Sequence, residues 1–116
     1  KDGENVDNLK INYKFNKVFV PSSAYDPLKE IATLLIADST LSIQITGHTD
    51  NVGSEAVNNR VSLKRAKSVS KYLIKQGVPK EQVTIVGKGE LDPIATNDTV
   101  EGRKENRRTE FKASKK

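Results

Sequence analysis

The chain has 116 residues, within the usual size of one compact domain, and 34% of them are hydrophobic. The formal net charge of +5 suits an anionic polymer as a partner, either a nucleic acid or the cell wall, and is equally compatible with a merely solvated surface. Cysteine is absent and the longest apolar run, residues 31–37, is short, which excludes disulfides, thiolate nucleophiles, cysteine-based zinc sites and a transmembrane helix.

The first half of the chain predicts a strand, a helix and a second strand. Apolar residues at every second position indicate the first strand: Leu9, Ile11, Tyr13 and Phe15. After a break at residues 21–23, helical spacing joins Leu28, Ile31 and Leu35, with Pro27 tolerated in the first turn. The second strand carries Leu41, Ile43 and Ile45 and ends at Gly47. A polar loop from His48 to Ser54 follows.

The second half predicts a longer helix and two further strands. The helix runs from about Ser54 to Gln76 and ends before Gly77 and Pro79. Its buried stripe is predicted to contain Leu63, Ala66, Val69 and Leu73. A third strand carries Val83 and Ile85, and the last strand carries Thr109, Phe111 and Ala113. Residues 99–106 are ambiguous and fit about one helical turn.

Alternating strands and helices predict βαβ units with right-handed crossovers. We therefore expect an α/β (α+β) sandwich of βαβαββ type, with about four strands in a mixed sheet. Two main helices should cover one face of that sheet, and a short third helix would fit at residues 99–106. Residues 9–114 would form this domain. Residues 1–8 would be a linker remnant of a longer protein.

A charged pair is predicted where the second strand ends and the long helix begins. Asp50 lies in the loop before the helix, and Arg65 lies on the helix, seven residues after Asn58 and therefore on the same helical face. Asp50 and Arg65 would then flank a shallow pocket. An acid and a base held a short gap apart complement a zwitterion, with Asp50 on the ammonium and Arg65 on the carboxylate through a bidentate fork.

Spacing alone also fits a purely structural role for this pair, and favours it. An aspartate just before a helix is commonly a cap or a turn former. An aspartate close to an arginine is commonly one half of an ordinary salt bridge. The residues by themselves leave both interpretations open.

Motifs of one protein family recur in order along nearly the whole chain from Ile11 onward. They are Gly47-His48-Thr49-Asp50-Asn51 with Gly53, Asn58, Leu63, Arg65-Ala66, Val69, Gly87-Lys88-Gly89-Glu90, Pro93, Asn97, Gly102-Arg103 and Asn106-Arg107-Arg108. On these residues the sequence resembles the OmpA-like C-terminal domain family, shared by OmpA-type porins, peptidoglycan-associated lipoproteins and MotB proteins. Together the motifs are specific, although none is specific alone.

The resemblance implies a non-catalytic anchor that binds peptidoglycan without a covalent bond, a cofactor or a metal. In this family the residues matching Asp50 and Arg65 hold the amino and carboxyl groups at the side-chain end of meso-diaminopimelate. A lysine-type wall lacks that carboxylate and would leave Arg65 unpaired, at a cost of about 1–3 kcal/mol. The implied location is the periplasmic face of the outer membrane in a diderm bacterium, with the parent protein anchored in that membrane.

The resemblance also implies further pocket residues. Thr49 and Asn58 match positions that line the same pocket. A loop that contacts the ligand partly through backbone groups matches Asn16, Lys17 and Val18. Arg107 is a further candidate, although a structural salt bridge is favoured for it. Within the family, the alternative function is a protein–protein interaction module of an envelope complex, with wall binding secondary.

Two other classes of function find little support in the sequence. For an enzyme, no serine stands in a nucleophile elbow, and the only histidine, His48, has no partner at metal-ligand spacing. Gly87 and Gly89 lack the third glycine and the Lys-Ser or Lys-Thr of a phosphate loop. For nucleic-acid binding, aromatics make up only 5% and no stacking pair lies on a predicted strand.

Overall fold

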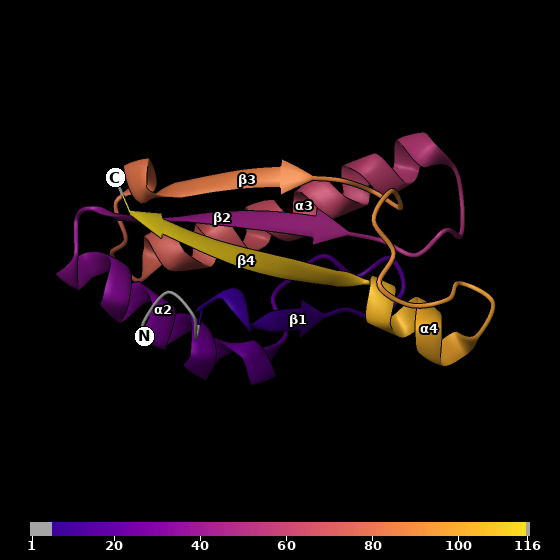
Figure 1. The fold of residues 1–116 in the computed structure, drawn as a ribbon, viewed down its shortest axis with the longest axis horizontal. Coiled ribbons are helices and arrows are strands. Elements are labelled where there is room, and N and C mark those ends of the chain that lie inside the picture. The colour runs from indigo at the N-terminus through magenta and orange to yellow at the C-terminus, as the bar shows by residue number, and fades with distance from the viewer. Residues whose placement is uncertain (1–5, 116) are drawn as a thin grey trace.

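A computed structural model describes residues 6–115, which fold into a four-stranded sheet and helices (Figure 1). In chain order, the elements are β1 (Lys10–Asn12), the 3-10 turn η1 (Ser22–Ala24), α2 (Tyr25–Ala37), β2 (Leu41–His48), α3 (Glu55–Lys75), the 3-10 turn η2 (Lys80–Gln82), β3 (Val83–Gly87), α4 (Val100–Asn106) and β4 (Arg108–Lys115). The sheet order is β1-β4-β2-β3, with β3 parallel to β2 and β4 antiparallel to its two neighbours. The predicted mixed sheet with two main helices, α2 and α3, on one face is confirmed, and the short third helix is α4 (Figure 1).

The hydrophobic core lies between that face of the sheet and the two main helices. On β2, Ile43 and Ile45 point toward the helices and are 2% and 0% exposed. Opposite them in register, β4 supplies Ala113 and Phe111. The buried residues of the two helices include Leu28, Ile31 and Leu35 of α2 and Ala66, Val69 and Leu73 of α3. The predicted periodicities of these elements are therefore confirmed, except at Leu63 of α3.

The first turns of α3 lie directly on the ends of β2 and β3. Gly47 pairs with Gly87 in the parallel register. A Cβ atom at Gly47 would collide with the backbone oxygen of Ser62, and one at Gly87 would come within 2.8 Å of the backbone nitrogen of Leu63. The prediction that Leu63 belongs to the buried stripe is wrong, because here the helix backbone itself contacts the strands and leaves the Leu63 side chain 44% exposed.

The first strand is shorter than its alternation predicts. β1 ends at Asn12, and the N–H of Tyr13 adds one more bond to the carbonyl of Arg107, at 2.9 Å. Phe15 is 48% exposed, so its inclusion in the strand is wrong. The chain turns at Asn16, whose φ of 60° is the left-handed conformation that asparagine tolerates.

Side-chain caps define the ends of the later helices. The Ser54 hydroxyl accepts a hydrogen bond from the N–H of Val57 at 3.2 Å, and α3 ends before Gly77 as predicted. The Thr99 hydroxyl accepts one from the N–H of Gly102 at 2.9 Å and starts α4. Residues 99–106, ambiguous in the sequence, therefore contain a seven-residue helix.

Two residues of the predicted linker pack against the domain. Val6 is 3% exposed in the core, and the Asp7 carboxylate accepts a hydrogen bond from the N–H of Ala113 at 2.7 Å. Residues 1–5, the rest of that predicted linker, lie outside the described residues. The domain boundary itself stays a prediction. Between residues 6 and 115, no helix has the length and apolar character needed to cross a bilayer.

Candidate functional site

Asp50 lies just beyond β2, in the loop that leads to α3, and is 2% exposed. One carboxylate oxygen, Oδ1, accepts a hydrogen bond from the N–H of Val52 at 3.1 Å and so forms the turn. The other, Oδ2, is 3.0 Å from Nη1 of Arg107 in an ion pair. The carboxylate is therefore fixed by the backbone on one side and by a guanidinium on the other.

Arg65 projects from α3 and is 1% exposed. Its nitrogens donate to three backbone carbonyls: Nε to Lys17 at 2.8 Å, Nη1 to His48 at 2.9 Å and Nη2 to Lys14 at 3.2 Å. The guanidinium also lies over the ring of Tyr13, 4.9 Å from its centroid. Since a guanidinium carries five N–H groups, two of its η N–H groups make no bond to residues 6–115.

The charge of Arg65 is balanced only partly. Burial lowers the pKa of Arg65 to about 10. The charge of Arg107 lowers this pKa further, whereas Tyr13 and Asp50 raise it. The side chain therefore stays cationic at neutral pH. No carboxylate in the described part of the chain lies within ion-pair distance of it. A buried cation that bonds only to neutral carbonyls is costly, and an incoming anion would relieve that cost.

Arg107 connects Asp50 to the first strand. It is the C-terminal cap of α4, immediately before β4. Besides its ion pair with Asp50, its Nε donates to the carbonyl of Tyr13 at 2.8 Å. The favoured salt bridge of Arg107 is thus formed, and its partner is the predicted binding residue itself. With one aspartate and two arginines, this cluster of Asp50, Arg65 and Arg107 has a formal charge of +1.

Thr49 and Asn58 lie beside this cluster, but their side chains bond to the protein. Thr49 is 5% exposed, and its hydroxyl donates to the backbone carbonyl of Asp50 at 2.8 Å. Asn58 is 4% exposed, and its amide donates to Oε1 of Glu90 at 3.1 Å. Both residues therefore shape the wall of the site.

The loop of Asn16, Lys17 and Val18 reaches the cluster through its backbone. The Lys17 carbonyl accepts the shortest of the three Arg65 hydrogen bonds. The side chains of Asn16 and Lys17 are exposed and that of Val18 is half-buried. The backbone of this loop thus contacts Arg65, the predicted carboxylate-binding residue.

Sequence reasoning missed several residues that build the site. The carbonyls of Lys14 and His48 hold Arg65, and no sequence signal marks them because every residue has a carbonyl. Ser62 supports the helix that carries Arg65: it is buried under the first turns of α3, where its hydroxyl accepts from the N–H of Gly89 at 2.9 Å. Tyr13, whose ring lies under Arg65, was predicted only as a residue of the first strand. Burial raises its pKa, which a bond to Thr109 and the charge of Arg65 oppose.

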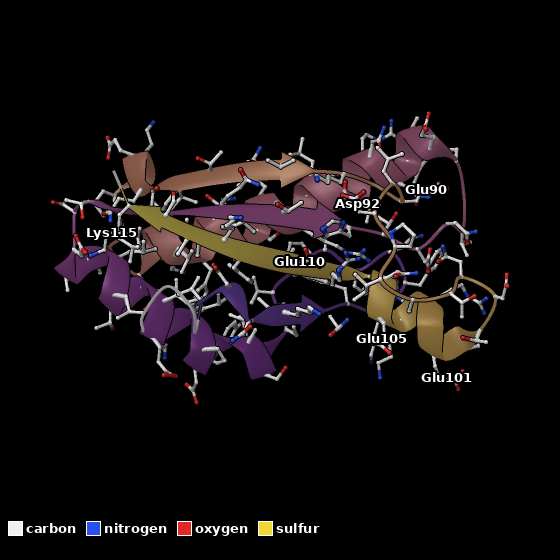
Figure 2. The ribbon with its side chains drawn as sticks, in the orientation of Figure 1. Glu90, Asp92, Glu101, Glu105, Glu110 and Lys115 are labelled. Atoms are coloured by element: carbon white, nitrogen blue, oxygen red, sulfur yellow. The ribbon has the colours of Figure 1, made fainter. Side chains whose placement is uncertain are left out.

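The opposite face of the sheet carries a second charged cluster at the same end. His48 is 2% exposed, and neither ring nitrogen has a hydrogen-bond partner among residues 6–115. Its Nε2 is 3.6 Å from Oε1 of Glu110, while Oε2 of Glu110 is 2.6 Å from Nε of Arg108. Burial, aided by the charge of Arg108, lowers the pKa of His48 to about 4. Figure 2 labels Glu110 and, on the neighbouring loop, Asp92.

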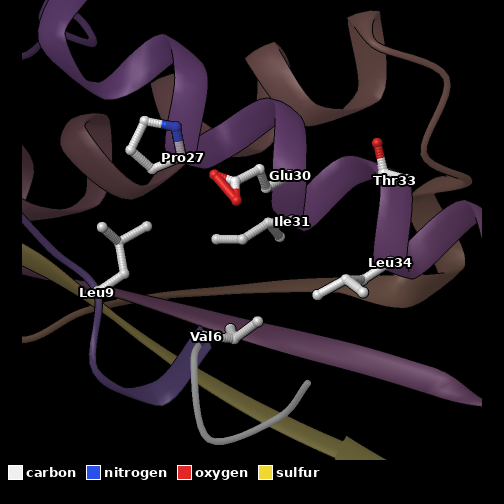
Figure 3. Close-up of a pocket in the computed structure, with 7 residues that line it drawn as sticks. All are labelled: Val6, Leu9, Pro27, Glu30, Ile31, Thr33 and Leu34. Atoms are coloured by element: carbon white, nitrogen blue, oxygen red, sulfur yellow. The ribbon is translucent and has the colours of Figure 1, made fainter. Parts of the chain in front are cut away.

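A cleft of about 410 Å³ between the start of the chain and α2 lies apart from both clusters (Figure 3). Its walls are mostly apolar, with Val6, Leu9, Ile31 and Leu34 among them. Among residues 6–115, Glu30 is the one charged residue that lines it. An apolar cleft with a single carboxylate does not complement a zwitterion, so the Asp50 cluster is the better candidate site.

Comparisons of sequence link the chain to proteins of known family. Residues 12–107 match the sequence model of the OmpA family. The chain is 36% identical over 102 residues to outer membrane porin F of Pseudomonas fluorescens, across 88% of this chain and 31% of the porin. It is 44% identical over 87 residues to peptidoglycan-binding protein ArfA of Mycobacterium tuberculosis, across 75% of this chain and 27% of ArfA. The chain thus spans less than a third of the length of these two relatives.

Solved structures show the same fold. The crystal structure of the peptidoglycan-associated lipoprotein from Burkholderia pseudomallei matches with a TM-score of 0.88 and 26% identity, over 90% of this chain and 89% of that one. The C-terminal domain of Helicobacter pylori MotB matches with a TM-score of 0.83 over 93% of this chain and 85% of that one. Its identity is 24%, so this likeness concerns the fold alone.

Proposed function

Because the chain belongs to the OmpA family, a family of non-enzymatic envelope domains, we propose that it binds peptidoglycan without a covalent bond by gripping the side-chain end of meso-diaminopimelate. That end carries an ammonium and a carboxylate on one carbon. Two similar proteins are named for peptidoglycan: the binding protein ArfA and the peptidoglycan-associated lipoprotein. The family and these names support wall binding, and the site supports the choice of ligand group.

The observation that carries the proposal is the state of Arg65. It is a buried guanidinium with neutral carbonyl partners, two unbonded N–H groups and no carboxylate partner among residues 6–115. Asp50, two residues beyond the carbonyl of His48 that Arg65 contacts, pairs with Arg107 instead. Neither charge of the predicted pair is therefore consumed by the other. A zwitterion could add a carboxylate to Arg65 and an ammonium to Asp50.

Each residue then has a defined role. The ligand carboxylate accepts from the two remaining N–H groups of Arg65, a charge-assisted bond in a site with little water. The ligand ammonium donates to Asp50, whose carboxylate oxygens each accept one bond already and keep a second lone pair. Arg107, Thr49, Asn58 and the loop of Asn16, Lys17 and Val18 position these two groups.

Selectivity for diaminopimelate over lysine follows from the same charge. Lysine has the ammonium and lacks the carboxylate, so a bound lysine side chain would cover Arg65 without pairing it. An unpaired buried charged group costs about 1–3 kcal/mol, which corresponds to roughly 5- to 150-fold in affinity. A single zwitterion need not bind tightly, because a polymeric wall presents many sites and raises the effective concentration.

Wall binding of this kind would anchor a larger envelope protein. We place the domain on the periplasmic side of the outer membrane, with the parent protein held in that membrane. The similarity to a porin and to a lipoprotein supports this placement. Residues 9–114 would be the anchoring unit.

Calorimetric titration of the chain with meso-diaminopimelate and with Nα-acetyl-L-lysine amide, whose α-amino and α-carboxyl groups are blocked, tests the proposal, beside sedimentation with purified walls of each type. We expect binding to meso-diaminopimelate at least about fivefold tighter than to the blocked lysine. Asp50→Asn keeps an acceptor for the N–H of Val52 and removes the charge, and Arg65→Lys keeps the charge and removes the fork. Both variants should lose binding to the purified walls.

Two exposed residues provide matched controls: Asp26→Asn on α2 and Arg60→Lys on α3. They make the same changes of charge and shape away from the site and should bind like the parent chain. Wild-type sedimentation by both Asp50→Asn and Arg65→Lys would overturn the proposal. Equal affinity for the blocked lysine and for diaminopimelate would also overturn the assigned role of Arg65.

A further inference from the structure

An open groove of about 430 Å³ borders the candidate site. Four cationic residues are among its lining residues, and no carboxylate of residues 6–115 is: Lys14, Lys17, Lys104 and Arg107. They come from two segments far apart in the sequence, namely the chain after β1 and the C-terminal end of α4. The groove is therefore bordered by cationic side chains, while its own surface is mostly apolar.

The groove also has an apolar side. Phe19, a large aromatic residue on its wall, is 81% exposed, and Pro21 lies beside it in the lining. An exposed aromatic next to several cations suits a ligand that carries both methylene groups and a carboxylate.

The groove and the candidate site share parts. Arg107 lines the groove, and its Nη1 is 3.0 Å from the carboxylate of Asp50. Lys14 and Lys17 line the groove, while their carbonyls hold the guanidinium of Arg65. A ligand seated on Asp50 and Arg65 would thus have its remaining atoms next to this groove.

Resting on the proposed function, we propose that the groove binds the D-glutamate residue that precedes diaminopimelate in the stem peptide. This residue is linked through its γ-carboxyl group, which leaves its α-carboxylate free. That carboxylate pairs with the ammonium groups of Lys14 and Lys104, and the methylene groups of the residue pack on Phe19. The Asp50 cluster already carries a formal charge of +1, so it favours an anionic ligand over a neutral one.

The test compares two tripeptides that differ in one group. One is L-Ala-γ-D-Glu-meso-diaminopimelate, and the other carries D-isoglutamine, which has an amide in place of the α-carboxylate. Exposed ion pairs contribute modestly, so we expect the parent chain to bind the first tripeptide about fivefold more tightly than the second. The Lys104→Gln variant should lose most of this preference, with unchanged affinity for free meso-diaminopimelate.

Lys71→Gln, on the exposed side of α3, removes the same charge away from the groove. This control should keep the preference for the D-glutamate tripeptide. Equal affinity of the parent chain for the two tripeptides overturns the inference and leaves the proposed function standing. Failure of the parent chain to bind either tripeptide or free meso-diaminopimelate would instead overturn the proposed function.

Discussion

At one end of the sheet, two consecutive arginines face opposite ways and meet different partners. Arg107 points to the helix-covered face and pairs with Asp50, whereas Arg108 points to the helix-free face and pairs with Glu110. Arg108 is 1% exposed and also donates to the carbonyls of Asn106 and Asp92, so its charge is matched inside the protein.

The hollows beside the two clusters differ in the same way. The groove next to Arg107 has cationic lining residues and no acid. The hollow of about 510 Å³ on the helix-free face is lined by three cations and three carboxylates: Lys88, Arg108, Lys112, Asp7, Asp92 and Glu110. Buried charge alone therefore does not distinguish the two clusters. What distinguishes the proposed site is the charge left over after internal pairing.

The largest expected effect concerns Arg65. Arg65→Ala leaves one buried and two partly buried carbonyls without their donor, so the free energy of unfolding should fall by about 3 kcal/mol. Wall binding should be lost as well. Urea denaturation measures the first effect and wall sedimentation the second. Arg60→Ala on the exposed side of α3 should change stability by no more than about 0.5 kcal/mol. Similar free energies of unfolding for Arg65→Ala and Arg60→Ala would show that the Arg65 side chain does not stabilise the fold.

The pH dependence of stability distinguishes the helix-free cluster. The pKa of His48 is about 4 in the folded chain, below its ordinary value of 6.5, so the unfolded chain takes up the proton first as the pH falls. The contribution of His48 is therefore complete above pH 6.5 and is lost as the pH falls toward 4, on the order of 3 kcal/mol. His48→Gln should flatten the slope of unfolding free energy between pH 7 and 4.5. Parallel slopes for the two chains would contradict this.

Arg108 provides the sharpest contrast with Arg107. Arg108→Met removes the 2.6 Å ion pair with Glu110 and two bonds to carbonyls, which should cost about 2 kcal/mol of unfolding free energy. At temperatures where the Arg108→Met variant is still folded, it should sediment with the wall as much as the parent chain does. Reduced sedimentation by the folded variant would mean that both faces contribute to binding.

The smallest effect is expected at Ser62, beneath the first turns of α3. Ser62→Ala leaves the N–H of Gly89 without its acceptor, at a cost of about 1 kcal/mol in thermal or urea unfolding. Ligand affinity should stay within twofold, about the precision of calorimetry, since Ser62 bonds to no residue of the Asp50 cluster. Ser68→Ala, half-buried on the same helix, is the control and should be close to neutral.

Much of the fold could be predicted from periodicity, because most of its elements bury regular apolar stripes. The exception is α4, whose Val100 is 66% exposed and which has no such stripe. Asn106 attaches it instead: its carbonyl oxygen accepts from Ile94 and Ala95, and its amide nitrogen donates to Ala95 and Asn97. Hydrogen bonds of one buried amide leave no periodic signal, so the length of this helix could not be predicted.

The candidate site divides in the same manner. Asp50 and Arg65 were predicted as binding residues because the motifs around them resemble those of a known family, whereas their spacing alone favours a structural pair. Their actual partners were not predicted, since Arg65 bonds to backbone carbonyls and Asp50 bonds to a residue 57 positions away. Helical spacing also misplaced Leu63, because spacing assumes that side chains separate the helix from the sheet.

That assumption fails at Gly47 and Gly87, and the failure has a consequence for engineering. Because Gly47 and Gly87 lack a Cβ atom, α3 can approach the strands closely, and this close approach determines how deeply the guanidinium of Arg65 is buried. Neither glycine carries a group that a ligand would touch, so inspection of contacts alone would pass over both. A designer who transplants this recognition unit to another sheet must carry the paired glycines along with the charged residues.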